Sequence, residues 1–344
     1  AFKDVALQMV GRLFDHELTR RGERATIVVA TSGDTGSAAI EACVGRDTLD
    51  IVVLHPAGRV SDVQRRQMTT VDAPNVHNVA IEGTFDDCQD LVKAMFADVA
   101  FRQRVRLSAM NSINWARVMA QVVYYASTVG QLGRCGFTVP SGNFGNIFAG
   151  WVAEQMGVPI GQLVIGSNRN DILSRWVADG SMVAEAVVPT LSPAMDIQVS
   201  SNHERLLFEL TGRDGAATAE LLTRFRGVGS IEAPRTDRFD AAAVDDDETL
   251  ATIRAVHEAT GRLIDPHTAV GVAAARRCRR GGGPMVCVAT AHPAKFPDAV
   301  EQATGVHPPL PERLADLLDR EERFEVLGND LAAVQAHVER CTTS

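Results

Sequence analysis

Only three residues of this chain carry a primary amine that could attack a carbonyl group. They are Lys3, Lys93 and Lys295, and the other basic residues, of 34 Lys and Arg in total, are all arginines. Lys93 lies on an amphipathic segment with Asp90 and Asp98, which indicates a solvated side chain. Lys295 follows a predicted strand and is a weaker candidate. Lys3 begins a predicted helix, where the dipole disfavours an ammonium ion and favours a nucleophilic amine. A frayed terminal lysine is the alternative for Lys3.

Two glycine-rich turns could bind anions. Residues 32–36 read Ser-Gly-Asp-Thr-Gly and residues 141–146 read Ser-Gly-Asn-Phe-Gly-Asn, each between a predicted strand and a predicted helix. Glycines let the backbone approach a ligand closely, and the free N–H groups of the following helix attract negative charge. Neither turn matches a dinucleotide-binding or Walker pattern, and one such turn alone indicates a tight connection. Two in one chain predict a site for two anions, such as a cofactor phosphate and a substrate carboxylate.

A third polar cluster, Asn-Ser-Ile-Asn-Trp-Ala-Arg at residues 111–117, leads into a predicted helix. Ser112 or Asn114 could cap that helix, and Arg117 would then be a solvated arginine. The alternative is a second oxyanion pocket, in which Arg117 holds a phosphate through two parallel hydrogen bonds. The residues themselves leave both interpretations open.

The elements that must position these residues are predicted by hydrophobic periodicity. Short buried-strand patterns alternate with helical patterns, at a spacing typical of α/β layers with mainly parallel sheets. The predicted strands are residues 25–30, 50–54, 76–81, 137–140, 163–166 and 285–289. The predicted helices are residues 2–21, 37–44, 85–99, 115–129, 147–156, 171–178, 248–260 and 269–277. Residues 180–245 give no clear pattern.

Composition and charge narrow the class of protein. A chain of 344 residues is long enough for about two domains. Hydrophobic residues make up 45% of it, yet no apolar run reaches the roughly 18 residues that span a membrane. The net charge of −9 argues against a nucleic-acid partner, which usually meets a basic surface. The six cysteines form no C-x-x-C pair and have no histidine at metal-ligand spacing, so we expect reduced thiols and no metal site.

Five short motifs follow one another along the chain. They read FKD at residues 2–4, ATSGDTG at 30–36, NSIN at 111–114, PSGNFG at 140–145 and TAHPAKF at 290–296. In this order they resemble the threonine synthases of the bacterial and fungal type, in the tryptophan-synthase-β-like group of pyridoxal-phosphate enzymes. Each motif is moderately specific, whereas the ordered set is highly specific and covers nearly the whole chain.

The resemblance implies pyridoxal-phosphate fold type II, with two α/β domains of mainly parallel sheets flanked by helices. It places the lysine and the carboxylate turn in a smaller domain, residues 1–130, and the cofactor-phosphate loop in a larger domain, residues 131–344. In the family a further segment precedes the lysine motif, and we expect this chain to lack that N-terminal segment.

The family's cofactor contacts are carried over position by position. Lys3 matches the lysine that forms a Schiff base with the cofactor aldehyde, and Thr290 matches the residue that faces the pyridine nitrogen. A hydroxyl there leaves that nitrogen largely unprotonated. Asp34 matches the position that contacts the ring hydroxyl, where many relatives carry Asn. The cofactor-phosphate loop is implied to comprise Gly142, Asn143, Phe144, Gly145 and Asn146.

The resemblance also implies the substrate contacts and the reaction. Two sets of residues suit the substrate: Ser32, Thr35 and Ser37 its carboxylate, and Asn111, Ser112 and Arg117 its phosphate. His267 and His292 either line the cleft or serve in capping and packing. The implied reaction converts O-phospho-L-homoserine and water to L-threonine and phosphate by β,γ-elimination and replacement, with Lys3 as the base.

Two other functions remain compatible with the same motifs. A related lyase would eliminate phosphate but release a 2-oxo acid, and a non-catalytic relative would bind or regulate without turnover. We expect a cytoplasmic enzyme, monomeric or homodimeric, that contacts neither nucleic acid nor a membrane.

Overall fold

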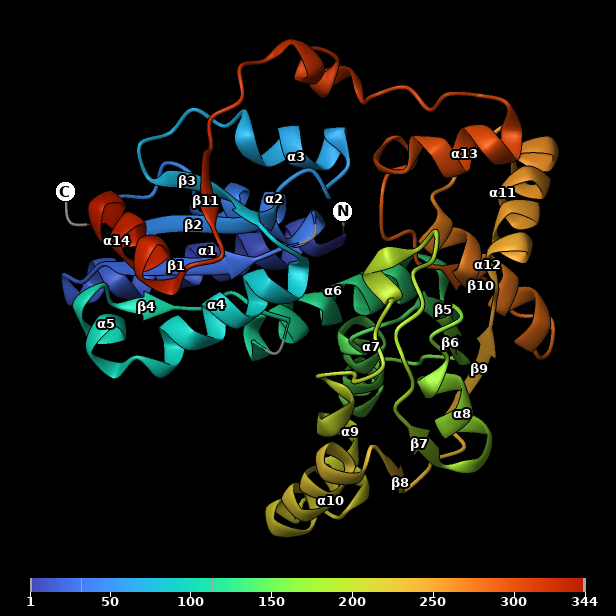
Figure 1. Ribbon diagram of the computed structural model, residues 1–344. Helices are drawn as coiled ribbons and strands as arrows, with labels where there is room; N and C mark the ends of the chain where they lie inside the picture. Colours follow the sequence, from blue (N-terminus) through green and yellow to red (C-terminus); the bar gives the residue numbers. More distant parts are fainter. Residues whose placement is uncertain (1, 32, 113, 343–344) are drawn as a thin grey trace. The chain divides into compact units, whose positions relative to one another are not determined.

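The computed structural model describes residues 2–31, 33–112 and 114–342. The chain forms two compact units, and each contains its own parallel sheet with helices on both faces (Figure 1). The first unit runs from the N-terminus to Arg117 and also takes in the chain from Leu310 onward. The second unit spans Val118–Pro309. This architecture confirms the predicted α/β class with mainly parallel sheets.

The first unit is organised around a parallel sheet in the strand order β11–β3–β2–β1–β4. All eight residues of β2 are buried, as expected for a parallel strand covered on both faces. Its strands are β1 (Ala25–Ala30), β2 (Leu49–Pro56), β3 (Val76–Glu82), β4 (Leu107–Ser108) and β11 (Glu325–Gly328). Its helices are α1 (Phe2–Arg21), α2 (Asp34–Cys43), α3 (Asp62–Thr69), α4 (Phe85–Ala97), α5 (Val99–Arg104) and α14 (Leu331–Thr342), with short 3-10 turns at Glu312–Leu314 and Leu317–Asp319.

Helices cover the two faces of this first sheet in separate cores. Leu7 and Val10 of α1 pack with α2 against one face, where Gly11 permits a close crossing because a Cβ there would lie 2.2 Å from the Ala42 carbonyl oxygen. On the other face, α4 and α5 pack with Val334 and Val338 of α14. The C-terminal helix therefore completes the core of the N-terminal unit.

The second unit contains a parallel sheet in the order β10–β5–β6–β9 and a small antiparallel pair, β7–β8. Helices α6 to α10 enclose the aromatic core on one face, while α12 covers the other. The strands are β5 (Gly136–Pro140), β6 (Leu163–Ser167), β7 (Ser181–Val183), β8 (Ser230–Glu232), β9 (Phe239–Ala243) and β10 (Met285–Cys287). The helices are α6 (Trp115–Leu132, which begins in the first unit), α7 (Gly145–Gln155), α8 (Ile172–Asp179), α9 (His203–Leu210), α10 (Gly215–Val228), α11 (Asp246–Thr260), α12 (Pro266–Cys278) and α13 (Pro297–Thr304), with 3-10 turns at Pro193–Met195 and Pro293–Lys295.

The limits of the two units differ from those expected from the sequence. The division falls between Arg117 and Val118, inside α6, whereas we placed it near residue 130. The segment after Leu310 was expected in the second domain but belongs to the first unit. The reason is strand pairing: Glu325 of β11 pairs with Val79 of β3, in parallel register. The sequence signal for this short edge strand is weak because its residues are mostly exposed.

Candidate functional site

The loop expected to hold a cofactor phosphate connects the carboxyl end of β5 to α7. Ser141 N donates to the Gly166 carbonyl at 2.9 Å, which keeps the start of the loop beside β6. Phe144 has φ 63°, and α7 begins at Gly145, two residues earlier than predicted. Because the first N–H groups of a helix have no partner within it, this turn presents donors suited to an anion.

The Phe144 side chain anchors this turn in the aromatic core. It is 1% exposed, and its ring lies 5.1 Å from that of His203, 5.7 Å from Phe239 and 6.4 Å from Trp176. This burial offsets the cost of a left-handed non-glycine residue, roughly 1–2 kcal/mol. Neither ring nitrogen of His203 has a hydrogen-bond partner among the described residues, and burial lowers the pKa of His203 to about 3. The imidazole is therefore neutral.

The carbonyl groups of the loop are taken up by the segment that precedes α9. Ser200 Oγ donates to the Gly142 carbonyl oxygen. Asn202 donates to the Asn143 carbonyl oxygen through its backbone N and its Nδ2, both at 3.1 Å. Ser201 Oγ also contacts Asn143 Oδ1 at 3.1 Å. With its acceptors satisfied by protein donors, the loop favours a negatively charged ligand.

Two further observations fit a phosphate group at this loop. A Cβ at Gly142 would lie 2.9 Å from the Ala194 carbonyl oxygen and 2.9 Å from Met195 Cα, so only glycine leaves the backbone in this position. Tyr125 Oη lies 2.6 Å from Asn146 Oδ1 and 2.9 Å from the Asn146 carbonyl oxygen. The buried Asn146 Nδ2 has no hydrogen-bond partner in the described part of the chain and is available to a ligand oxygen.

His267 holds the segment that packs against this loop at Gly142. Its Nε2 accepts a hydrogen bond from Ala194 N at 3.2 Å, so the proton must be on Nδ1, which donates to Asp265 Oδ1 at 2.8 Å. Asp265 is fully buried and also caps α12 by accepting the His267 and Thr268 N–H groups. Of the two roles considered for His267, the structure favours packing, since it fixes the segment next to Gly142.

The motif after β10 contains Thr290, His292 and Lys295. Thr290 is buried, with 7% exposed. His292 caps the following 3-10 turn by accepting from Ala294 N at 3.2 Å, which again is the capping role. Partial burial and the charge of Lys295 lower the pKa of His292. Lys295 itself is buried, with 5% of its surface exposed.

In the first unit, the turn between β1 and α2 is closed by Thr31. Its Oγ1 accepts from Gly33 N at 2.9 Å and from Gly36 N at 3.0 Å. Gly33 has φ 148° and ψ −95°, a conformation that favours glycine. Because α2 begins at Asp34, the expected carboxylate contacts Thr35 and Ser37 lie in its first turn and are half-buried. Ser32 lies outside the described residues.

Gln64, a residue that we did not predict, lies under this turn. Its Nε2 donates to Asp34 Oδ1 at 3.1 Å, while its Oε1 accepts from Ser61 Oγ at 3.0 Å. A Cβ at Gly33 would come within 2.6 Å of the Gln64 amide. Asp34 is 8% exposed, so a hydrogen bond to its carboxylate is strong. The spacing of Ser61 and Gln64 is typical of a helix start and gives no sign of a contact with Asp34.

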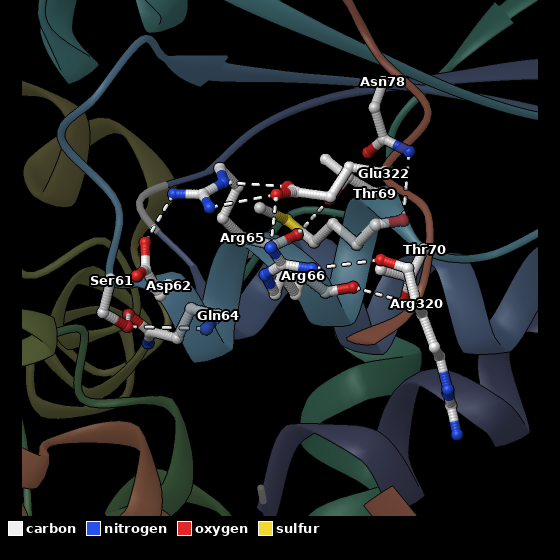
Figure 2. Close-up of polar contacts among 11 residues, drawn as sticks. Ser61, Asp62, Gln64, Arg65, Arg66, Thr69, Thr70, Asn78, Arg320 and Glu322 are labelled. Carbon is white, nitrogen blue, oxygen red and sulfur yellow. Dashed lines mark hydrogen bonds and ion pairs between the residues drawn. The ribbon is translucent and has the colours of Figure 1, made fainter. Parts of the chain in front are cut away.

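Helix α3, which carries Gln64, is held by the segment before β11 (Figure 2). Arg65 Nε and Nη2 donate to the Glu322 carboxylate at 2.8 and 3.0 Å. Thr69 Oγ1 donates to the same carboxylate at 2.7 Å, and Arg66 Nη1 donates to the Arg320 carbonyl at 3.0 Å. The hydrogen bonds of Arg65 and Thr69 hold the pKa of Glu322 at about 2. These contacts hold α3 next to the turn between β1 and α2.

The cluster before α6 contains a helix cap and a buried arginine. Asn114 Oδ1 accepts from Ala116 N at 2.9 Å and so caps the helix, as one interpretation predicted. Arg117 is only 4% exposed, and its Nη1 donates to the Met110 carbonyl at 3.1 Å. The solvated interpretation of Arg117 is therefore wrong. Asn111 is exposed and Ser112 is half-buried.

The three lysines have different surroundings. Lys93 is exposed and pairs with Asp90 at 2.8 Å, as expected for a solvated residue. Lys3 is half-buried in the first turn of α1, with its Nζ 5.8 Å from the centre of the Phe2 ring. Lys3 shares the first unit with Asp34 and Arg117, whereas the phosphate loop and Thr290 belong to the second unit. Among the described residues, no helix is long and apolar enough to cross a membrane, and no His, Cys, Asp and Glu side chains are grouped to hold a metal ion.

Known proteins match this chain over nearly its whole length. The family described as "Pyridoxal-phosphate dependent enzyme" matches residues 1–291, and "Threonine synthase, C-terminal" matches residues 268–338. A curated relative, threonine synthase of Pseudomonas aeruginosa, is 57% identical over 98% of this chain and 75% of its own length.

Solved structures agree with these matches. The pyridoxal-phosphate-bound threonine synthase from Brucella melitensis has a TM-score of 0.96 and 53% identity, with 100% of this chain and 76% of that chain covered. Threonine synthase from yeast has a TM-score of 0.91 and 38% identity, with the same coverage of both chains. This chain thus spans about three quarters of the length of these relatives.

Proposed function

The chain belongs to the threonine synthase family of pyridoxal-phosphate-dependent enzymes, and from this premise we propose that it converts O-phospho-L-homoserine and water to L-threonine and phosphate. It is a threonine synthase, a carbon–oxygen lyase that uses pyridoxal phosphate. When bound, pyridoxal phosphate supplies an electron sink that stabilises negative charge on the carbon next to the substrate amine. The specific substrate and the roles of individual residues are our proposals.

The residues of the second unit fit the cofactor's phosphate. Gly142, Asn143, Phe144, Gly145 and Asn146 would hold it, through the N–H groups at the start of α7 and the buried Asn146 Nδ2. Support comes from the loop carbonyls, which are already occupied by Ser200 and Asn202. Thr290, buried after β10, would face the pyridine nitrogen as a hydroxyl.

In the first unit, Lys3 and Asp34 would meet the reactive part of the cofactor. Lys3 would hold the cofactor through its aldehyde before substrate arrives. Its Nζ would then take the proton from the substrate α-carbon and one from the β-carbon. One of these two protons would be delivered to the γ-carbon, which becomes the methyl group of threonine, and the other would return to the α-carbon. Water would supply the hydroxyl group at the β-carbon and a proton to the departing phosphate. Asp34, oriented by Gln64, would contact the ring hydroxyl.

Substrate anions would bind at two places in the first unit. Thr35 and Ser37, in the first turn of α2, would receive the carboxylate together with Ser32. Asn111, Ser112 and Arg117 would receive the phosphate that leaves the γ-carbon. The burial of Arg117 is the observation that supports O-phosphohomoserine as the substrate. A desolvated guanidinium group is suited to bind a phosphate through two parallel hydrogen bonds.

Product analysis tests the proposal. The protein loaded with pyridoxal phosphate should convert O-phosphohomoserine to threonine and phosphate in equal amounts. Formation of phosphate with a 2-oxo acid in place of threonine would contradict it, as would a cofactor-loaded protein with no turnover. A cytoplasmic location and a monomeric or homodimeric state are also proposed, to be tested by cell fractionation and light scattering.

A further inference from the structure

A cavity opens at the amino edge of the sheet of the second unit, where β5, β6 and β10 begin. Its volume is about 260 Å³, and the residues around it include Gly136, Gly161 and Met285. That is slightly below the roughly 300–1,000 Å³ typical of pockets for drug-sized ligands. The cavity therefore suits a small ligand.

Three arginines give this cavity a positive charge in a chain whose net charge is −9. Arg280 is neutralised by an ion pair with Asp240. Arg279 Nη2 donates to the Gly283 carbonyl at 2.9 Å, which fixes its guanidinium beside the cavity without cancelling its charge. Arg134 makes no hydrogen bond or ion pair with any residue that the structure describes. Two arginine charges are thus left for a ligand.

Gly283, the last residue of a glycine loop, also lines the cavity. Residues 281–283 are all glycine and exposed, and a Cβ at any of them would meet no atom within 4 Å. Their backbone N–H groups have no acceptor within the described part of the chain. The accessible N–H group of Gly283 and two guanidinium groups that are not neutralised provide donors for an anion in this cavity.

The cavity is separate from the phosphate loop of the same unit. Cys135 and Gly136 lie at the start of β5, whereas the phosphate loop follows its end at Pro140. A five-residue strand is about 16 Å long, at roughly 3.3 Å per residue. A ligand in the cavity would not occupy the cofactor site.

We propose that this cavity is a further anion site, which binds a small phosphate-bearing molecule through Arg134, Arg279 and the N–H group of Gly283. Arginine suits phosphate better than lysine because its planar group donates two parallel hydrogen bonds. The proposal does not depend on the reaction that the enzyme catalyses.

The test uses the full chain loaded with pyridoxal phosphate, in an Arg117→Ala background that weakens the proposed substrate-phosphate site. Inorganic phosphate, pyrophosphate and a nucleoside monophosphate are titrated separately by calorimetry, which distinguishes inorganic from organic sources. Hydrogen exchange with bound ligand should slow at residues 130–137 and 279–286. Changing Arg134 and Arg279 together to Gln should weaken binding of the preferred ligand about tenfold or more and abolish this protection.

Arg262→Gln is the matched control, because Arg262 is an exposed arginine of the same unit that lies outside the cavity. It should leave both binding and protection unchanged, and in the chain with Arg117 intact the double variant should retain turnover. Equal binding in the double variant and the control would overturn the proposal. So would the absence of slowed exchange at residues 130–137 and 279–286 with all three ligands.

Discussion

Gln64 Nε2 donates a hydrogen bond to Asp34 Oδ1 at 3.1 Å, and its amide fills the space that any side chain at Gly33 would need. Gln64→Ala should therefore lower kcat/KM about 5- to 150-fold, because removing a hydrogen bond from a buried carboxylate costs roughly 1–3 kcal/mol. Gln64→Glu should be worse, since it places a second carboxylate beside Asp34. Steady-state kinetics with O-phosphohomoserine measures both variants.

Gln103→Ala, at an exposed position of α5 in the same unit, is the control for this change and should behave as wild type. Wild-type kinetics for Gln64→Glu would show that the contact with Asp34 has no functional role.

Gly142→Ala should weaken cofactor binding about tenfold or more. The added Cβ would meet backbone atoms of Ala194 and Met195 at 2.9 Å, so the loop itself must move. Titration with pyridoxal phosphate, followed by absorbance, gives the affinity. Gly215→Ala is the control, because a Cβ there meets nothing within 4 Å. If both variants bind the cofactor as tightly as wild type does, the loop is not the phosphate site.

Arg117→Ala should leave the cofactor spectrum intact but reduce turnover strongly. Loss of a buried charge-assisted contact costs roughly 2–5 kcal/mol, or about 30- to several-thousand-fold in kcat/KM. Arg117→Lys should recover only part of this loss, because an ammonium group lacks the planar, paired N–H donors of a guanidinium group. The assay is phosphate release, with folding checked by thermal melting. A variant that loses the cofactor instead would show that the two phosphate sites are exchanged.

The Arg65–Glu322 ion pair should make stability depend on pH. Its hydrogen bonds lower the pKa of Glu322 from 4.5 to about 2, so its contribution is complete above pH 4.5 and is lost as the pH falls toward 2. Glu322→Gln should cost at most about 3 kcal/mol at pH 7 and progressively less below pH 4.5. Urea denaturation at pH 7, 4.5 and 3 measures this, with the exposed Glu321→Gln as control. A difference from wild type that stays constant with pH would contradict the assignment.

The regular elements could be predicted because their hydrophobic periods are clear. The helix at residues 2–21 and the strand at 25–30 are confirmed to the residue. Helices α2 and α7 start earlier than predicted, at Asp34 and Gly145, because their first turns contain the glycines that we assigned to loops. Residues 180–245 gave no pattern because long loops separate their elements, which range from the three-residue strands β7 and β8 to the 14-residue helix α10.

Site residues could be proposed from the sequence only where a motif marks them. No motif identifies Gln64, because its hydrogen bond to Asp34 depends on how β2 and α3 fold next to the turn that contains Asp34. The hydrogen bonds that hold α3 depend on Glu322, which is more than 250 residues from Arg65 along the chain. For Arg117 the residues alone left a solvated and a phosphate-binding interpretation open, because a charged residue after a helix cap is usually solvated, and its burial excludes the first.

The central claim is that Lys3 is the residue that holds pyridoxal phosphate, and reductive labelling tests it most directly. The cofactor-loaded protein is reduced with borohydride and digested, and the labelled peptide is identified by mass spectrometry. The chain offers three lysines, of which Lys93 is exposed and Lys295 is buried in the second unit. We predict label on Lys3, and none after Lys3→Ala. Label on Lys295 or Lys93 in the wild-type protein would contradict the account.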